Sequence, residues 1–155
     1  MKRLIAILLV LSISAPCWAG LASDKSMYIG GTAPLKQGAE AVLNTADENV
    51  LAFTDWKVPY KSVTGLSYGQ HAGRRVGATV ALGVTTLGIG ALPMLFSKKR
   101  RHYLTIEYTD DAGKPQAAIF EVGKNAVRTA LKTLEVRTGK KIEYEDDEAR
   151  KAGNK

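Results

Sequence analysis

Alternating hydrophobic and polar residues are clearest in the second half of the chain. Residues 103–109 are rich in aromatic and β-branched side chains, and residues 116–122 resume this pattern after the turn-forming sequence DDAGK at 110–114. Aromatic and β-branched residues favour strands, whereas Asp and Gly favour the turns that join them. The pattern therefore predicts an antiparallel hairpin over residues 103–122.

Shorter β-compatible runs precede this hairpin. Residues 27–29 predict an edge strand that ends in a turn at the following two glycines. Residues 39–44 and 50–54 are separated by a polar stretch with Asp and Asn, which predicts a second hairpin. Apolar residues recur at every second position within residues 62–68, so we expect one more strand there.

The last hydrophobic pattern has helical spacing. Apolar residues recur at steps of three and four within 126–138, and Gly139 is a typical helix stop. We expect a short strand at 142–144 and, because residues 145–155 are almost all charged or small, a disordered tail. The predicted helix face consists of Val127, Ala130, Leu131, Leu134 and Val136.

The order of these elements predicts an α+β domain, namely an antiparallel half-barrel of about six strands closed by a C-terminal helix. This order, together with the apolar and aromatic strand segment 60–69, resembles bacterial pleckstrin-homology-like and GRAM-like domains over residues 27–144. The resemblance implies a domain class that binds phosphoinositides, membranes or peptides, or has no ligand at all. It assigns no functional residue by position.

The N-terminal residues predict export. Lys2 and Arg3 precede an apolar run at 4–11, and a small residue, Ala19, stands at the expected cleavage site. These are the three parts of a secretory signal peptide, and the apolar run is about half of the roughly 20 residues that a membrane-spanning helix needs. We therefore expect residues 1–19 to be removed, residues 20–26 to form a linker, and the protein to work in the periplasm or cell envelope. An uncleaved anchor and a lipoprotein on Cys17 are the alternatives.

Composition narrows the function further. Cys17 is the only cysteine, so the mature chain has no disulfide and no thiol nucleophile. The chain has 22 basic and 15 acidic residues, and loss of the signal peptide removes only two basic ones. This positive charge favours anionic partners. For an exported protein we expect anionic membrane surfaces, acidic proteins or self-association, and no nucleic acid.

An uncharged, glycine-rich apolar insertion at 76–97 interrupts the predicted domain between two basic clusters. It is long enough to span a bilayer once, but a single span would separate the strands before it from those after it. Three arrangements stay open: a hairpin of two short helices that dips into one leaflet or self-associates, a spanning helix, and apolar helices packed over the half-barrel. The expected membrane contacts are basic, Arg74, Arg75, Lys98, Lys99, Arg100 and Arg101, and apolar, Val80, Leu82, Leu87, Ile89, Leu92, Leu95 and Phe96.

No catalytic constellation is recognisable in the sequence. His71 and His102 each stand beside a basic cluster, so we interpret them as solvated flanking residues rather than metal ligands. If the two met in space, their protonation at low pH would strengthen attraction to anionic lipid. We expect no catalytic residue, no metal and no cofactor, and hence a non-catalytic module that associates with a membrane or with itself. The alternative is a soluble envelope module that binds a partner peptide.

Overall fold

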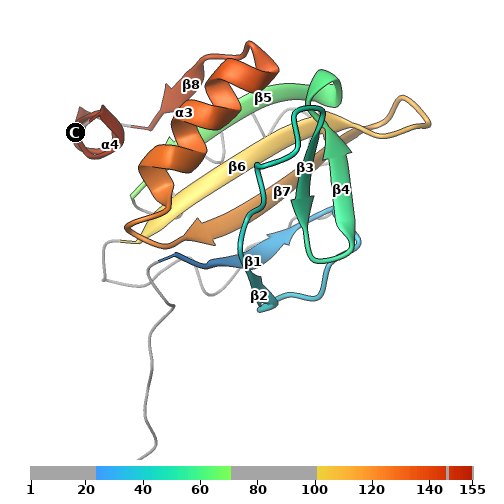
Figure 1. Cartoon of the computed structure of the whole chain (residues 1–155), viewed down its shortest axis with the longest axis horizontal. Coiled ribbons are helices and arrows are strands. Elements are labelled where there is room, and N and C mark those ends of the chain that lie inside the picture. The colour runs from blue at the N-terminus through green and yellow to red at the C-terminus, as the bar shows by residue number, and fades with distance from the viewer. Residues whose placement is uncertain (1–23, 71–100, 146, 155) are drawn as a thin grey trace, which may run out of the picture.

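The computed structural model describes residues 24–70, 101–145 and 147–154 (Figure 1). Most elements of these residues are strands, and two α-helices, with one short strand between them, come near the C-terminus. The elements are β1 (Ser26–Gly31), β2 (Glu40–Ala41), β3 (Val50–Phe53), β4 (Trp56–Pro59), the 3-10 turn η1 (Tyr60–Ser62), β5 (Val63–Gly69), β6 (His102–Thr109), β7 (Pro115–Val122), α3 (Val127–Thr138), β8 (Ile142–Tyr144) and α4 (Asp147–Asn154).

Six strands form one sheet in the order β2-β1-β7-β6-β5-β8. All neighbours are antiparallel except β5 and β8, which run parallel. The strands β3 and β4 form a separate two-stranded sheet. Helix α3 and this small sheet lie on the same side of the large sheet, so the core has two layers (Figure 1).

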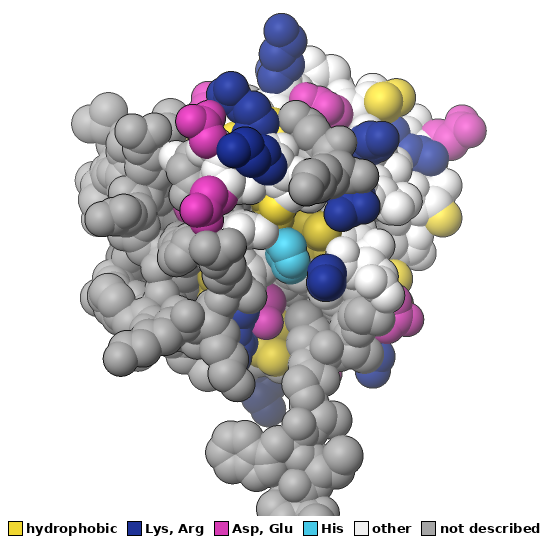
Figure 2. Space-filling view, turned by 90° about the vertical axis from the view of Figure 1, so that its left-hand side faces the viewer, with side chains coloured by type: hydrophobic (Ala, Val, Ile, Leu, Met, Phe, Trp, Pro, Cys, Tyr) yellow, Lys and Arg dark blue, Asp and Glu magenta, His cyan; other side chains and the backbone are white. Residues whose placement is uncertain are grey.

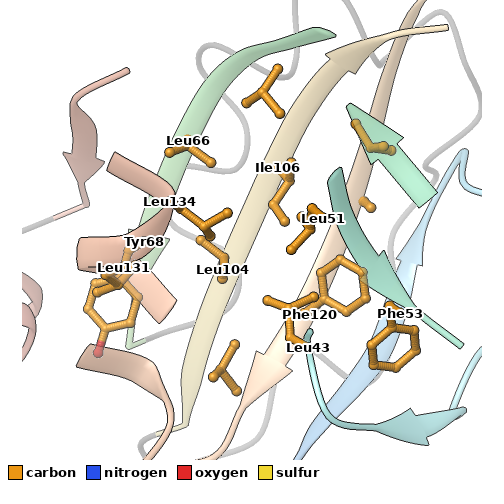
Figure 3. Packing of buried hydrophobic residues seen from close by; sticks show 14 of the residues in the cluster. Leu43, Leu51, Phe53, Leu66, Tyr68, Leu104, Ile106, Phe120, Leu131 and Leu134 are labelled. Atoms are coloured by element: carbon orange, nitrogen blue, oxygen red, sulfur yellow. The ribbon is translucent and has the colours of Figure 1, made fainter. Parts of the chain in front are cut away.

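The core fills the space between these layers. The side chains of Leu104, Phe120 and Leu134 are fully buried, and α3 contributes Val127 and Leu131 to the same cluster (Figure 3). The ring of Phe120 contacts the rings of Tyr28, Phe53 and Trp56 at centroid distances of 4.9–5.6 Å. Trp56 is thus a core residue, and its tilted arrangement against Phe120 is one that aromatic rings prefer.

The opposite face of the large sheet carries a second, smaller apolar cluster. It consists of Ile29, Tyr103 and Ile119, with Met27 packed against it. These three residues are at most 5 % exposed. Both faces of the sheet are therefore apolar near the paired strands β1, β7 and β6.

The predicted hairpin over 103–122 and the predicted helix are confirmed. Strands β6 and β7 pair over their whole lengths around the turn at 110–114. Helix α3 buries Val127, Leu131 and Leu134, and ends at Gly139 in the left-handed conformation. The predicted short strand at 142–144 is β8. Val136, however, is 83 % exposed and belongs to the solvent face.

The predicted fold class, a PH-like half-barrel of about six strands with an apolar helical hairpin, is wrong. The structure instead has a six-stranded sheet and a separate two-stranded sheet, and no glycine-rich helical hairpin exists among the described residues. The insertion at 76–97 lies outside them. The predicted hairpin of residues 39–44 with 50–54 fails because β2 pairs with β1 and β3 pairs with β4, which leaves one isolated bridge between Asn44 and Ala52.

Two local predictions also differ from the structure. Strand β1 is not an edge strand, since β2 and β7 flank it, and its two glycines continue the strand through a bulge instead of forming a turn. The tail is not disordered, because residues 147–154 form α4 and bury Ala149 completely. Acidic residues in the first turn of α4 and Lys151 in its last turn suit the helix dipole.

Candidate functional site

The two ends of the segment 71–100 leave the sheet at one corner. Strands β5 and β6 are antiparallel neighbours, and Gly69 lies opposite Tyr103. The backbone N–H of Arg101 donates a hydrogen bond to the carbonyl of Gln70 over 3.3 Å. A helix that crossed a membrane once between these residues would put β5 and β6 on opposite sides of the bilayer, which their pairing excludes.

Most residues of the predicted membrane contact lie outside the described part of the chain. This holds for Arg74, Arg75, residues 98–100 and all of the predicted apolar contacts. Arg101 is described, and its Nη1 lies 2.6 Å from Oε2 of Glu121, a residue only 8 % exposed. This hydrogen bond raises the pKa of the Arg101 side chain above its ordinary value. Arg101 is therefore part of a charged pair at this corner.

His102 begins β6 on the side of the sheet that faces α3. Its Nδ1 lies 2.5 Å from the hydroxyl oxygen of Tyr68, and the two rings stack at a centroid distance of 6.0 Å. Tyr144 of β8 meets Tyr68 edge-on, also at 6.0 Å. His102 is thus half-buried and bonded to Tyr68, so the prediction of a solvated histidine is wrong. His71 lies outside the described residues.

Burial lowers the pKa of His102 below its ordinary value of 6.5, and the positive charges of Lys124 and Arg128 lower it further. The imidazole is therefore neutral at pH 7. In the tautomer with the proton on Nε2, the Tyr68 hydroxyl donates to Nδ1 and Nε2–H remains a donor.

Lys124 and Arg128 were not predicted from the sequence as site residues. Both are exposed, and they stand just before and within the first turn of α3. Figure 2 shows Lys and Arg side chains around His102 on this face. The first turn of α3 contains no acidic residue, although acidic residues suit the positive N-terminal end of a helix. The sequence signal that could have identified this site is the presence of basic residues, and no acidic one, at the start of the predicted helix.

Lys124 and Arg128, with the neutral His102 beside them and the Arg101–Glu121 pair at the same corner, form what we call the basic end. Positive side chains and the N-terminal end of α3 attract anions to this surface. Within residues 24–70, 101–145 and 147–154, no three His, Cys, Asp or Glu residues lie close enough to hold a metal ion. In the same residues, no helix is both long and apolar enough to cross a membrane.

The aspartates at the β6–β7 turn have a structural role. Asp110 accepts hydrogen bonds from the backbone N–H groups of Ala112 and Lys114, and from the side chain of Gln116. The bond from Lys114 is the main reason why the pKa of Asp110 is lowered. The predicted turn is thus stabilised by its own side chain.

Comparison of this chain with protein-family models, with curated proteins and with solved structures finds no match. The resemblance to pleckstrin-homology-like and GRAM-like domains therefore stays a prediction.

Proposed function

We propose that the mature protein is an exported, non-catalytic module of the cell envelope that associates with an anionic membrane surface. The apolar insertion at 76–97 enters one leaflet, and the basic end faces the lipid headgroups. The observation that supports this proposal is the backbone hydrogen bond between Arg101 and Gln70, which places both ends of the insertion at one corner of the sheet. A segment with both ends at one point can enter a membrane and return to the same side.

The lengths and charges agree with this arrangement. The segment at 76–97 has 22 residues and no charge, so one half of it is long enough to enter one leaflet and the other half to return. Each basic side chain near an anionic surface contributes about 1 kcal/mol to binding. The exposed residues Lys124 and Arg128 lie near His102, beside the corner where the insertion starts and ends.

Vesicle flotation of the signal-cleaved protein tests the proposal. The matched variant replaces residues 71–100 by Asn-Gly, a two-residue turn that joins antiparallel strands. Since Gln70 and Arg101 are already hydrogen-bonded, this turn closes β5 and β6 without moving them. We expect the intact protein to float with vesicles that contain phosphatidylglycerol, and the variant to stay soluble and folded but unbound.

Two results would contradict the proposal. The first is an intact protein that binds no vesicle at any salt concentration. The second is a variant that floats as well as the intact protein, because binding would then not involve the insertion. If the intact protein is soluble and unbound and the variant aggregates, the insertion instead packs against protein, and the apolar cluster of Ile29, Tyr103 and Ile119 is the surface it would cover.

A further inference from the structure

The imidazole ring of His102 offers one nitrogen to a ligand at the basic end. Its other nitrogen, Nδ1, is bonded to the hydroxyl group of Tyr68, and the two rings stack. Tyr144 packs edge-on against Tyr68 and completes a row of three rings. The His102 ring is thus held in place while it remains only half-buried. This leaves Nε2–H as a fixed donor with no partner among the described residues.

Lys124 and Arg128 bring two positive charges to this ring. Both side chains are exposed, and both lie close enough to His102 for their charges to lower its pKa. Lys124 stands just after Val122, the residue that pairs with His102 across the sheet. Arg128 follows in the first turn of α3. The three side chains therefore come together from β6, from the connection after β7, and from α3.

The positive charges of Lys124 and Arg128 are available to a ligand. Neither residue has an ion-pair partner among the described residues, and the first turn of α3 has no acidic residue. Glu121 is the acidic residue whose charge acts on His102, and its carboxylate is held by the Arg101 guanidinium at 2.6 Å. A ligand at this site therefore meets one neutral donor and two positive charges.

A phosphate monoester is the ligand that fits these three donors. At pH 7 it carries a charge of about −1.5 to −2 and has three terminal oxygens that are strong acceptors. Hydrogen bonds from ammonium and guanidinium groups to such oxygens are charge-assisted, and a guanidinium group can bond to two of them. A phosphodiester or a carboxylate has a single negative charge and fewer free oxygens, so it would leave part of this set of donors unused.

We propose that His102, Lys124 and Arg128 together bind a phosphate monoester group, with Nε2–H of His102 as the positioned donor. The site itself needs no membrane. The inference rests on the proposed membrane association only where the phosphate belongs to a lipid headgroup, and a soluble phosphate compound is the other source of the same group.

Titration of the signal-cleaved chain with methyl phosphate, followed by NMR at a pH slightly above neutral, tests the site. The substitution His71→Gln leaves His102 as the only histidine, so the ring signals have one assignment. We expect saturable shifts of the His102 ring protons and of the Arg128 side chain, and none with dimethyl phosphate, a diester with one charge. Bound methyl phosphate should also raise the pKa of His102, because a nearby negative charge favours the imidazolium form.

Substitutions separate this site from the general positive charge of the chain. Arg128→Gln and Lys124→Gln should each weaken the binding of methyl phosphate about tenfold, the loss of roughly one charge-assisted hydrogen bond. Lys114→Gln is the matched control, because it removes the same charge at the other end of β6. The site is overturned if dimethyl phosphate binds as well as methyl phosphate, or if the three substitutions weaken binding equally. It is also overturned if saturating methyl phosphate leaves the pKa of His102 unchanged.

Vesicle binding of the same proteins tests the source of the phosphate. The two kinds of vesicle contain phosphatidic acid, a monoester, or phosphatidylglycerol, a diester, at equal surface charge. If the source is a lipid, the intact protein should bind phosphatidic acid about tenfold more tightly, and Arg128→Gln should reduce this preference. Equal binding to both vesicles, with saturable binding of methyl phosphate, overturns the lipid source and leaves a soluble phosphate compound as the ligand. Because the titrations contain no membrane, a failed phosphate site and a failed membrane association give different results.

Discussion

His102 is the residue at which burial, charge and hydrogen bonding meet. Its place was not predictable from neighbouring residues, because its partner Tyr68 lies 34 positions earlier in the chain. The pairing of β5 with β6 brings the two together. The positive charges of Lys124 and Arg128 reach His102 through the pairing of β6 with β7, which the hairpin pattern did predict.

The lowered pKa of His102 predicts a pH-dependent stability. Above the ordinary pKa of 6.5 the ring is neutral in both the folded and the unfolded chain, so it has no effect. As the pH falls below 6.5, the unfolded chain takes up the proton first, and the free energy of unfolding decreases. We expect urea denaturation to show lower stability at pH 5 than at pH 7.5, and this difference to shrink in His102→Gln.

The matched variant is needed because Glu107 acts in the opposite direction. Burial raises the pKa of Glu107 above its ordinary value of 4.5, and Glu143 raises it further. The charged form of Glu107 is therefore disfavoured in the folded protein, and stability decreases as the pH rises through that range. Only the difference between the intact protein and His102→Gln isolates His102. An identical pH dependence of the two proteins would refute the assignment.

Gly31 is fixed by its backbone and its surroundings. It has φ +130°, and a Cβ atom there would collide with the backbone oxygen of Ala117. Gly113 in the β6–β7 turn has φ +75° but open space around it. We expect Gly31→Ala to lower the free energy of unfolding by about 3 kcal/mol or more, and Gly113→Ala by only about 1 kcal/mol. Equal losses in urea denaturation would show that the contact with Ala117 relaxes.

At the scale of elements, the predicted strands and turns were confirmed where the local sequence pattern of a hairpin was strong, and were wrong where it was weak. Residues 103–122 carry both strands and a turn stabilised by Asp110, so local sequence was enough. The turn between β3 and β4 consists of Thr54 and Asp55, and Thr54 adopts a positive φ of 51°. Thr and Asp are weaker hairpin signals there than Asn and Gly, which explains the wrong partner predicted for β3. The helix α4 was not predicted, because its sequence is mostly charged and small residues. It packs against the core through the buried Ala149.

The start of α3 allows a test in which binding and stability change in opposite directions. In the double variant Lys124→Glu and Arg128→Glu, negative charges stand at the positive end of the helix and stabilise it. The same variant repels an anionic membrane. Since each basic residue contributes about 1 kcal/mol, we expect vesicle binding at low salt to weaken at least about tenfold while the melting temperature does not fall.

Lys114→Glu is the control for this experiment. Lys114 is exposed in the turn at the other end of β6, so it changes the net charge of the chain away from the basic end. It should weaken vesicle binding much less than Lys124→Glu or Arg128→Glu alone. Equal effects at the three positions would mean that net charge, and not the basic end, directs the protein to the membrane.

At the scale of the whole molecule, the sheet is built from both sides of the insertion. The chain up to Gln70 supplies β1 and β5, and the chain from Arg101 supplies β6 and β7, which lie between them. Most of these strands were predicted from the sequence. The pairing of β1 with β7 was not predicted. That contact joins residues about ninety positions apart.

This interleaved order predicts that the protein folds from two separate chains, 20–70 and 101–155. Neither chain alone can complete the sheet, because β6 and β7 need β5 and β1 as neighbours. Mixing the chains should restore the β-sheet circular dichroism and a single complex in gel filtration. Leu104→Asp in the second chain should prevent assembly, since Leu104 is fully buried, whereas Lys114→Glu should not. If the two chains stay unfolded when mixed and the Asn-Gly variant is unfolded as well, the segment 71–100 is itself needed for folding, and its proposed role at the membrane would have to be abandoned.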